Sequence, residues 1–358
     1  MYYKNDLEIA KKRIKAWWEG EIIDRVAISV TAPRDGVKPR AIPKPFDSNN
    51  FFSRWTNIEY NMEVAEENIR STYWGGEALP NFMPNLGPSI FAVWLGCELK
   101  FGEDTSWAEP IKIDDPNRFS LNFDKNNKWW KLIKDYTRAA TIKGKDKFFV
   151  KITDLHPGGD ALSTIRGTEN FCMDTITYPN KVKEWMSFVN KVWFEIYEEL
   201  YKITKSQGQE GSFGWLVWAP GKTYPVSDDF LALISPKMFK EFFWDASKEQ
   251  CEYLDYAIFH LDGPQCIVHL DLLLEMPKLR GIQWEPGDGH RPMTKWVHIL
   301  KKIQQRRKIL HLTVEPYEIE ILLGELSPKG IMFNCICSTE EEAKELLKKA
   351  SKWSTNST

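Results

Sequence analysis

The fold is decided by one stretch of the chain, YAIFHLDGPQCIVHLDLLLEMPKLRGIQWEPGDG (residues 256–289). Residues 257–261 form a short apolar run that ends in a D-G-P turn signal. Apolar side chains follow at helical spacing over 266–275, and 279–284 form a second short apolar run. Strand, helix and strand in this order predict a parallel α/β unit, in which chemistry is placed at the C-terminal ends of the strands. The ionisable side chains at these ends are His260, Asp262 and Glu285.

The same alternation of strand and helix continues on both sides of this stretch. Most of the predicted strands are followed by a helical pattern, and together they predict a (β/α)8 TIM barrel. The barrel is expected to be one domain over residues 1–358, with long N-terminal loops and helices (about 1–110) decorating its mouth. A doubly wound sheet is the alternative, although no GxGxxG or GxxxxGK[ST] motif supports nucleotide binding. The predicted strands lie at 26–31, 81–84, 148–153, 212–218, 257–261, 279–284, 309–313 and 330–334.

The bulk composition is that of an ordinary globular protein. Of 358 residues, 42% are hydrophobic and 27% are charged, and the net charge is −2. This charge gives no reason to expect nucleic acid or an anionic membrane as a partner. No apolar run reaches the roughly 18 residues of a spanning helix, and the N-terminus lacks a secretory pattern, so a cytoplasmic location is expected. The six scattered cysteines are not a disulfide framework.

Polar side chains collect at the predicted strand ends, which converge on one mouth in a barrel. His260 and Asp262 stand out, because residues i and i+2 of an extended strand share one face. Together with Glu285 and a cysteine they could form a divalent-metal or acid/base group. The alternative is a His–Asp pair in which the carboxylate only orients the imidazole. Further candidates are Asp228 and Asp229 as catalytic carboxylates, Asp154 and His156 as substrate-binding groups, and Cys335 as the cysteine, unless Cys337 takes its place.

The chain contains 16 tryptophans, and several of them fall in or beside the predicted mouth. Indole and phenol rings there predict a sizeable apolar pocket for a small-molecule substrate. For any one ring the alternative is that it fills the core or a loop. The aromatic residues assigned to substrate binding are Trp107, Trp218, Tyr224 and Trp284.

Four stretches resemble the uroporphyrinogen decarboxylase superfamily, and the chain is similar to a divergent member of that superfamily. The superfamily shares a (β/α)8 barrel and includes the decarboxylase itself and zinc-dependent, corrinoid-linked methyltransferases. The resemblance lies in order and spacing over the C-terminal two thirds. The stretches are GGDALSTIRGTENFCMDTITYPNKV (158–182), SDDFLALISPKMFKEFF (227–243), FHLDGPQCIVHLDLLLEMPKLRGIQWE (259–285) and GIMFNCICSTEEEAKELL (330–347).

Carried over to this chain, the methyltransferase site implies a zinc ion. The resemblance places His260 at the family's histidine, Asp262 where the family has a cysteine, Glu285 at a further carboxylate ligand and Cys335 near the last cysteine. A carboxylate in place of a thiolate makes the ligand set harder, which suits an oxygen nucleophile or substrate better than a thiol. A metal-free site is the alternative.

The resemblance implies a methyltransferase-like enzyme that acts on a small molecule, with a corrinoid protein as a partner. A decarboxylase-type or other metal-free lyase is one alternative, although the arginine-rich N-terminal signature of the decarboxylase is missing and only Arg25 stands near its place. A carbohydrate-active enzyme that pairs Asp228 and Asp229 with Asp262 and Glu285 is another. The third is a barrel that binds a ligand without catalysis.

Overall fold

The segment around His260 folds as predicted in the computed structural model, which describes residues 1–355. Strand β10 (Tyr256–Asp262) leads through a short 3-10 turn, η4 (Pro264–His269), into helix α11 (Leu270–Glu275) and then into strand β11 (Leu279–Glu285). Gly263 has a φ of 78°, a left-handed conformation that glycine adopts without steric cost, so the chain turns sharply directly after Asp262. The two strands pair in parallel, with His260 beside Gln283 and Asp262 beside Glu285.

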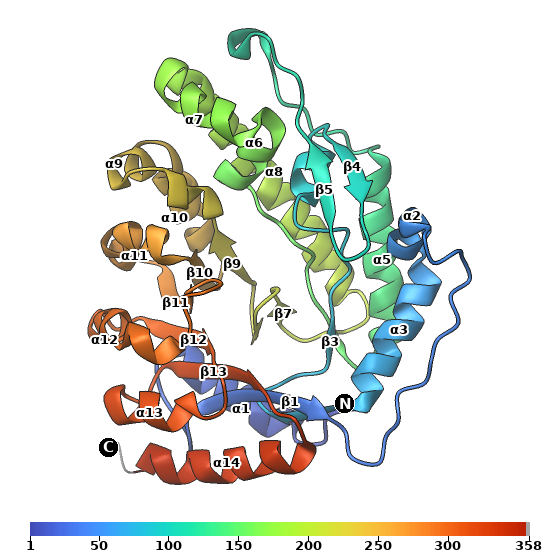
Figure 1. Cartoon of the computed structure of the whole chain (residues 1–358), viewed down its shortest axis with the longest axis vertical. Helices are drawn as coiled ribbons and strands as arrows, with labels where there is room; N and C mark the ends of the chain where they lie inside the picture. The colour runs from blue at the N-terminus through green and yellow to red at the C-terminus, as the bar shows by residue number, and fades with distance from the viewer. Residues whose placement is uncertain (356–358) are drawn as a thin grey trace.

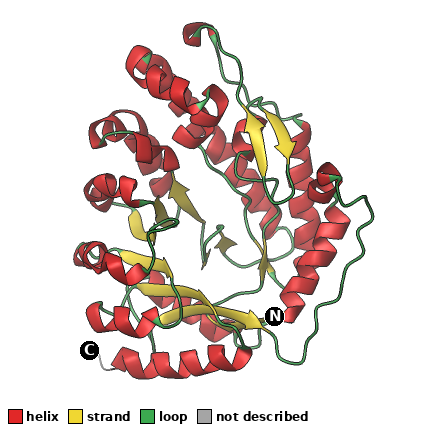
Figure 2. Cartoon of the chain, in the orientation of Figure 1, coloured by secondary structure: helices red, strands yellow, loops and turns green. Residues whose placement is uncertain are grey.

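Helices surround the strands (Figures 1 and 2). The α-helices are α1 (Leu7–Trp18), α2 (Phe51–Thr56), α3 (Ile58–Ser71), α4 (Ile90–Trp94), α5 (Lys128–Gly144), α6 (Gly158–Arg166), α7 (Thr168–Thr177), α8 (Pro179–Lys205), α9 (Pro236–Met238), α10 (Trp244–Tyr253), α11, α12 (Val297–Gln305), α13 (Glu318–Glu325) and α14 (Glu340–Thr355). The remaining helical turns are η1 (Pro116–Arg118), η2 (Asp229–Leu233), the π-helical η3 (Phe239–Phe243), η4 and η5 (Met293–Trp296).

The central sheet has seven strands in the order β2-β1-β13-β12-β11-β10-β9. All pairs in it are parallel except β1 with β2, which is antiparallel. Three two-stranded sheets accompany it: β3 with β6, β4 with β5, and β7 with β8. The strands are β1 (Ala27–Pro33), β2 (Thr72–Gly76), β3 (Asn81–Phe82), β4 (Glu98–Phe101), β5 (Ser106–Glu109), β6 (Phe149–Val150), β7 (Ser212–Phe213), β8 (Trp218–Ala219), β9 (Thr223–Ser227), β10, β11, β12 (Ile309–Thr313) and β13 (Ile331–Ile336).

The α/β class is confirmed, but the closed eight-stranded barrel is not. Within residues 1–355 the seven-stranded ladder does not return to its first strand. The short strands β3, β6 and β7 lie across the gap (Figure 1), and a hydrogen bond from the Ile152 amide to the Phe213 carbonyl (3.0 Å) links the end of β6 to β7. Proline explains part of the gap, because Pro80 and Pro84 flank the two residues of β3 and cannot donate to a ladder.

The strand predicted at 212–218 is wrong in extent. It folds into the hairpin of β7 and β8, and the strand that joins the central sheet is β9, within a segment that sequence patterning predicted as a loop. All five residues of β9 are buried, although their sequence, TYPVS, shows neither an apolar run nor a clean alternation. Burial against α8 and α10 therefore overrides the weak local preference of this segment.

Helix α1 covers the N-terminal ends of the strands. The Trp17 indole donates to the Leu310 carbonyl and the Trp18 indole to the Trp218 carbonyl, both at 3.0 Å. These two rings pack in a cluster that includes Ile258 and other residues early in the strands. Aromatic side chains therefore fill the space at the N-terminal ends of the strands, which we call the floor of the strand ring. The C-terminal ends of the strands are left for a site.

Candidate functional site

Three ligand-type side chains meet at the C-terminal end of β10. One ligand atom each from Asp229, His260 and Asp262 lies within 4.8 Å of the other two. In β10 the odd-numbered Phe259 and Leu261 pack in the outer apolar core, so the alternation turns His260 and Asp262 to the inside. Asp229 follows β9, the neighbouring parallel strand. The structure thus brings together three of the predicted catalytic residues.

Two neighbours hold the His260 ring. The Nδ1 atom is in a hydrogen bond with Gln283 Oε1, and the Trp215 indole lies edge-on to the imidazole with ring centroids 4.9 Å apart. Because a carboxamide oxygen only accepts, this pairing places the proton on Nδ1 and leaves the lone pair of Nε2 free. A hydrogen bond at the far nitrogen of this kind is how metal-binding histidines are commonly oriented.

Asp228 and Asp229, adjacent in sequence, have different roles. Asp228 is buried, and its Oδ2 accepts from the Gly159 amide (2.9 Å) at the start of α6. In return, Asp160 accepts from the amides of Asp229 (3.1 Å) and Phe230 (2.9 Å). A Cβ on Gly159 would lie 2.6 Å from Asp228 Oδ1, so only glycine permits this approach. Asp228 therefore braces the loop, and the exposed Asp229 is presented to the mouth.

His156 is enclosed by carboxylates. Its ring nitrogens lie 3.7 Å from Asp160 and 3.9 Å from Asp154, and Ser227 Oγ is 3.3 Å from Nδ1. Burial alone would lower the pKa of His156, but the nearby carboxylate of Asp160, with the charges of Asp154 and Asp229, raises that pKa to about 9. At neutral pH His156 is therefore an imidazolium that can donate a proton close to Asp229, one of the three ligand-type side chains.

The other predicted strand-end acid, Glu285, already has a partner. It forms an ion pair of 2.6 Å with Arg291 and does not join the group of three. Two other cations, Arg166 and Lys222, are also paired, with Asp174 (2.5 Å) and Glu198 (2.7 Å). A site built to bind several carboxylates at once would need free cations here.

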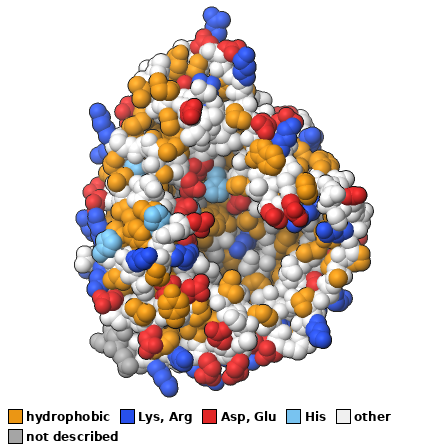
Figure 3. Space-filling model, in the orientation of Figure 1, with side chains coloured by type: hydrophobic (Ala, Val, Ile, Leu, Met, Phe, Trp, Pro, Cys, Tyr) orange, Lys and Arg blue, Asp and Glu red, His pale blue; other side chains and the backbone are white. Residues whose placement is uncertain are grey.

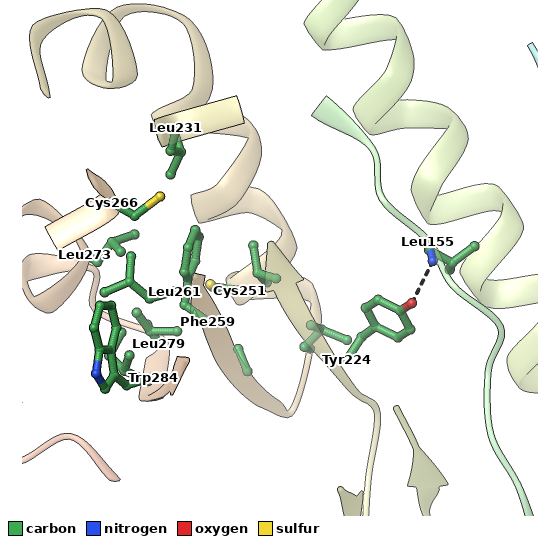
Figure 4. Packing of buried hydrophobic residues seen from close by; sticks show 14 of the residues in the cluster. Leu155, Tyr224, Leu231, Cys251, Phe259, Leu261, Cys266, Leu273, Leu279 and Trp284 are labelled. Atoms are coloured by element: carbon green, nitrogen blue, oxygen red, sulfur yellow. Dashed lines mark hydrogen bonds between the residues drawn. The ribbon is translucent and has the colours of Figure 1, made fainter. Parts of the chain in front are cut away.

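Strand alternation sends several predicted site residues to the outer layer. Trp284 is buried in the core beside Leu279 and Leu261 (Figure 4). Its ring centroid lies 5.2 Å from that of Trp296. Cys335 packs in the same core, while its neighbour Asn334 lines the interior cavity. Burial, followed by the Cys337 thiol, raises the pKa of Cys335, which disfavours the thiolate that binds metals. Cys335 does not join the ligand group.

The other three aromatic candidates lie apart from the ligand group. Tyr224 is buried, and its hydroxyl accepts from the Leu155 amide (2.7 Å, Figure 4) and donates to the Thr153 carbonyl (2.8 Å), so it positions the loop that carries Asp154 and His156. Trp107 lies on the β4–β5 hairpin and is 45% exposed. Trp218 does line the interior cavity, near the floor formed by α1.

A cavity of about 340 Å³ opens inside the ring, within the usual size range of small-molecule sites. Figure 3 shows the hollow in this face of the molecule, with acidic side chains and a histidine on its wall. Its polar lining includes residues that the sequence did not single out. They are Ser29, Thr31, Lys151, His311, Thr313 and Asn334.

The cavity is linked to the ligand group through a row of inward side chains. His260 of β10 pairs with Gln283 of β11, which pairs with His311 of β12. Burial, followed by the charges of Lys151 and His260, lowers the pKa of His311 to about 4. Each of Gln283 and His311 is a polar residue at an inward position of an otherwise apolar strand, which is the signal in the sequence that could have revealed them.

Comparison with known proteins bears on the fold of the chain. No family model matches the chain, and no curated protein matches it. Among solved structures, a methyltransferase from Methanosarcina mazei aligns over 96% of this chain and 98% of its own, with a TM-score of 0.63 and 14% sequence identity. The two proteins share a fold. At this identity the likeness extends to the fold alone. Within residues 1–355, no helix has both the length and the apolar character that crossing a membrane requires.

Proposed function

We propose that this protein is a methyltransferase-like enzyme that acts on a small molecule, with a divalent cation such as zinc held by Asp229, His260 and Asp262. The proximity of these three ligand atoms, within 4.8 Å, is the observation that carries the proposal. The methyltransferase from Methanosarcina mazei, which shares the fold over nearly the whole chain, supports the reaction class. We propose a corrinoid protein as the methyl acceptor, as the sequence resemblance implies.

The donor set fits a metal on two counts. Gln283 leaves the Nε2 lone pair of His260 free to coordinate. Desolvation by the surrounding protein, followed by the charge of Asp160, raises the pKa of Asp229. A cation bound here would offset the repulsion between these carboxylates. Two carboxylates and one imidazole form a harder set than one containing thiolates and favour an oxygen atom of the substrate.

When bound, the cation would act as a Lewis acid toward that oxygen. The chain supplies the remaining functions. His156, an imidazolium at neutral pH, would donate a proton to the oxygen that loses its methyl group. The Asp228 brace and the Tyr224 hydroxyl hold the loops of Asp229 and His156 in register. The cavity inside the ring would enclose the rest of the substrate.

The first test is the metal content of the purified chain. After loading with Zn²⁺ and desalting, elemental analysis is expected to find about one equivalent per chain. The variants His260→Ala and Asp262→Asn are expected to lose it. His298→Ala, which removes an exposed histidine, and Cys335→Ala are expected to retain it. A parent chain that holds no metal, or a His260→Ala variant that holds as much as the parent, would refute the proposal.

A second candidate function rests on the same acids. The oxygens of Asp229 and Asp262 lie close enough for a pair that acts on one glycosidic bond. Such an enzyme would hydrolyse aryl glycosides after treatment with EDTA. The methyltransferase proposal predicts no such hydrolysis and full dependence on the cation, so one assay with and without EDTA separates the two.

A further inference from the structure

Lys151 is a half-buried cation with unused hydrogen-bonding capacity. Its ammonium donates to the Trp215 carbonyl (2.8 Å) and lies 4.8 Å from the centre of the Phe213 ring. Within residues 1–355 no carboxylate is in ion-pair contact with it. An ammonium has three N–H donors, so two remain for a ligand in the cavity that Lys151 lines.

A second polar side chain of the same cavity also lacks a partner. His311 is 4% exposed, and no atom of the described chain forms a hydrogen bond with its Nδ1. A buried polar atom left without a partner costs about 1–3 kcal/mol, so an unpaired atom at a cavity wall points to a ligand or water that satisfies it. The hydroxyls of Ser29 and Thr31 and the amide of Asn334 face the same space.

Glu77, the one acid among the described residues that line the cavity, is already neutralised. Glu77 receives hydrogen bonds from Arg25 (2.8 and 3.0 Å) and from the Ile28 amide (2.6 Å). Among the described residues that line the cavity, Lys151 is the one lysine or arginine, and no ion pair includes it. An anionic ligand group would restore the balance and use its free donors.

We propose that the cavity binds a carboxylate group of the substrate, with Lys151 as its cationic partner and His311 and Asn334 as further hydrogen-bonding groups. The substrate class is then a small carboxylate that carries a second oxygen function. This inference rests on the proposed function only for the position of that second oxygen at Asp229, His260 and Asp262.

The register of the strands limits the length of such a substrate. His260 and His311 lie two strands apart, which corresponds to about 10 Å at the usual spacing of 4.7–4.9 Å, and less between inward side chains. A cavity of about 340 Å³ has the liquid volume of roughly ten waters. A substrate with a ring or a short chain between its two oxygen-containing groups fits both this length and this volume.

The test compares two probes of one shape, 4-methoxybenzoate and its neutral amide, 4-methoxybenzamide. Calorimetric titration uses EDTA-treated protein, so that no cation contributes to carboxylate binding. The parent chain is expected to bind the benzoate about tenfold more tightly or better. Lys151→Met is expected to bring the ratio near one, while Lys131→Met, which removes an exposed lysine, is expected to leave it unchanged.

Equal binding of both probes by the parent chain, or a preference that survives Lys151→Met, would overturn the inference. Crystals of the parent chain with 4-bromobenzoate give a second measurement that does not depend on the folding of a variant. The carboxylate is expected within hydrogen-bonding distance of Lys151 Nζ, and any other orientation counts against the proposal. A chain that takes up no Zn²⁺ on loading but still prefers the benzoate would refute the proposed metal site and leave the carboxylate site standing.

Discussion

Gln283 is the residue on which the orientation of His260 depends. Replacing it with Leu keeps the side-chain size but removes the acceptor for Nδ1, so the imidazole loses its fixed tautomer. We expect Gln283→Leu to weaken Zn²⁺ affinity about 10- to 100-fold, as measured by competition with a chelator. Gln304→Leu, at a position with exposed hydrogen bonds to the backbone, serves as the matched control and is expected to leave the affinity unchanged.

His156 makes stability depend on pH. The folded-state pKa is raised from 6.5 to about 9, so its contribution is complete below pH 6.5 and is lost as the pH rises through 9. In EDTA-treated protein, the difference in unfolding free energy between the parent and His156→Gln should therefore fall by on the order of 3 kcal/mol from pH 6 to 9.5. His298→Ala should give a flat difference. A His156→Gln difference that stays constant with pH would contradict the assigned charge.

At this scale the sequence predicts only part of the site. His260 and Asp262 are recognisable because both follow an apolar run two residues apart, at a strand end. Gln283 and His311 are polar residues inside strands, and Lys151 directly follows one. That local pattern marks them as inward-facing but does not show which partners they meet. Their importance comes from register across strands that are far apart in the sequence.

Among the elements, β9 contacts the loop after β6 through the buried hydroxyl of Tyr224. Tyr224→Phe removes the bond to the Leu155 amide and leaves a buried N–H without a partner. We expect a loss of about 1–3 kcal/mol in urea unfolding. The control, Tyr317→Phe, removes a hydroxyl from a ring that is 65% exposed and should change stability little. Equal stability of Tyr224→Phe and the parent would show that the loop is held by other contacts.

Sequence patterning predicts β10 to β13 to within two residues at each end, because each is a continuous apolar run closed by turn residues. It fails at β7, β8 and β9, which are short and lack both a continuous apolar run and a clean alternation, and whose pairing is set by packing. The same alternation that locates His260 explains the positions of Trp284 and Cys335. Both occupy outward places on strands whose inward neighbours, Gln283 and Asn334, face the interior.

For the whole molecule, the closure of the floor by α1 is the decisive long-range contact. Trp18 is 2% exposed, donates to the Trp218 carbonyl and packs on Tyr256 with ring centroids 5.3 Å apart. Trp18→Ala should lower the free energy of unfolding by about 3–5 kcal/mol. Trp107→Ala, at an exposed indole, should cost less than about 1 kcal/mol in the same denaturant titration. Similar losses for the two variants would mean that α1 is peripheral.

Because the ladder of strands is interrupted, one side of the interior cavity is more rigidly held than the other. Strands β10 to β13 are each held by a parallel neighbour on both sides and carry His260, Gln283 and His311. The short strands β3, β6 and β7, near Lys151, have few inter-strand bonds, and segments held in this way open locally at low free-energy cost. Local opening on the Lys151 side would admit ligands of different width, while the positions of His260, Gln283 and His311 in the continuous part of the sheet stay fixed.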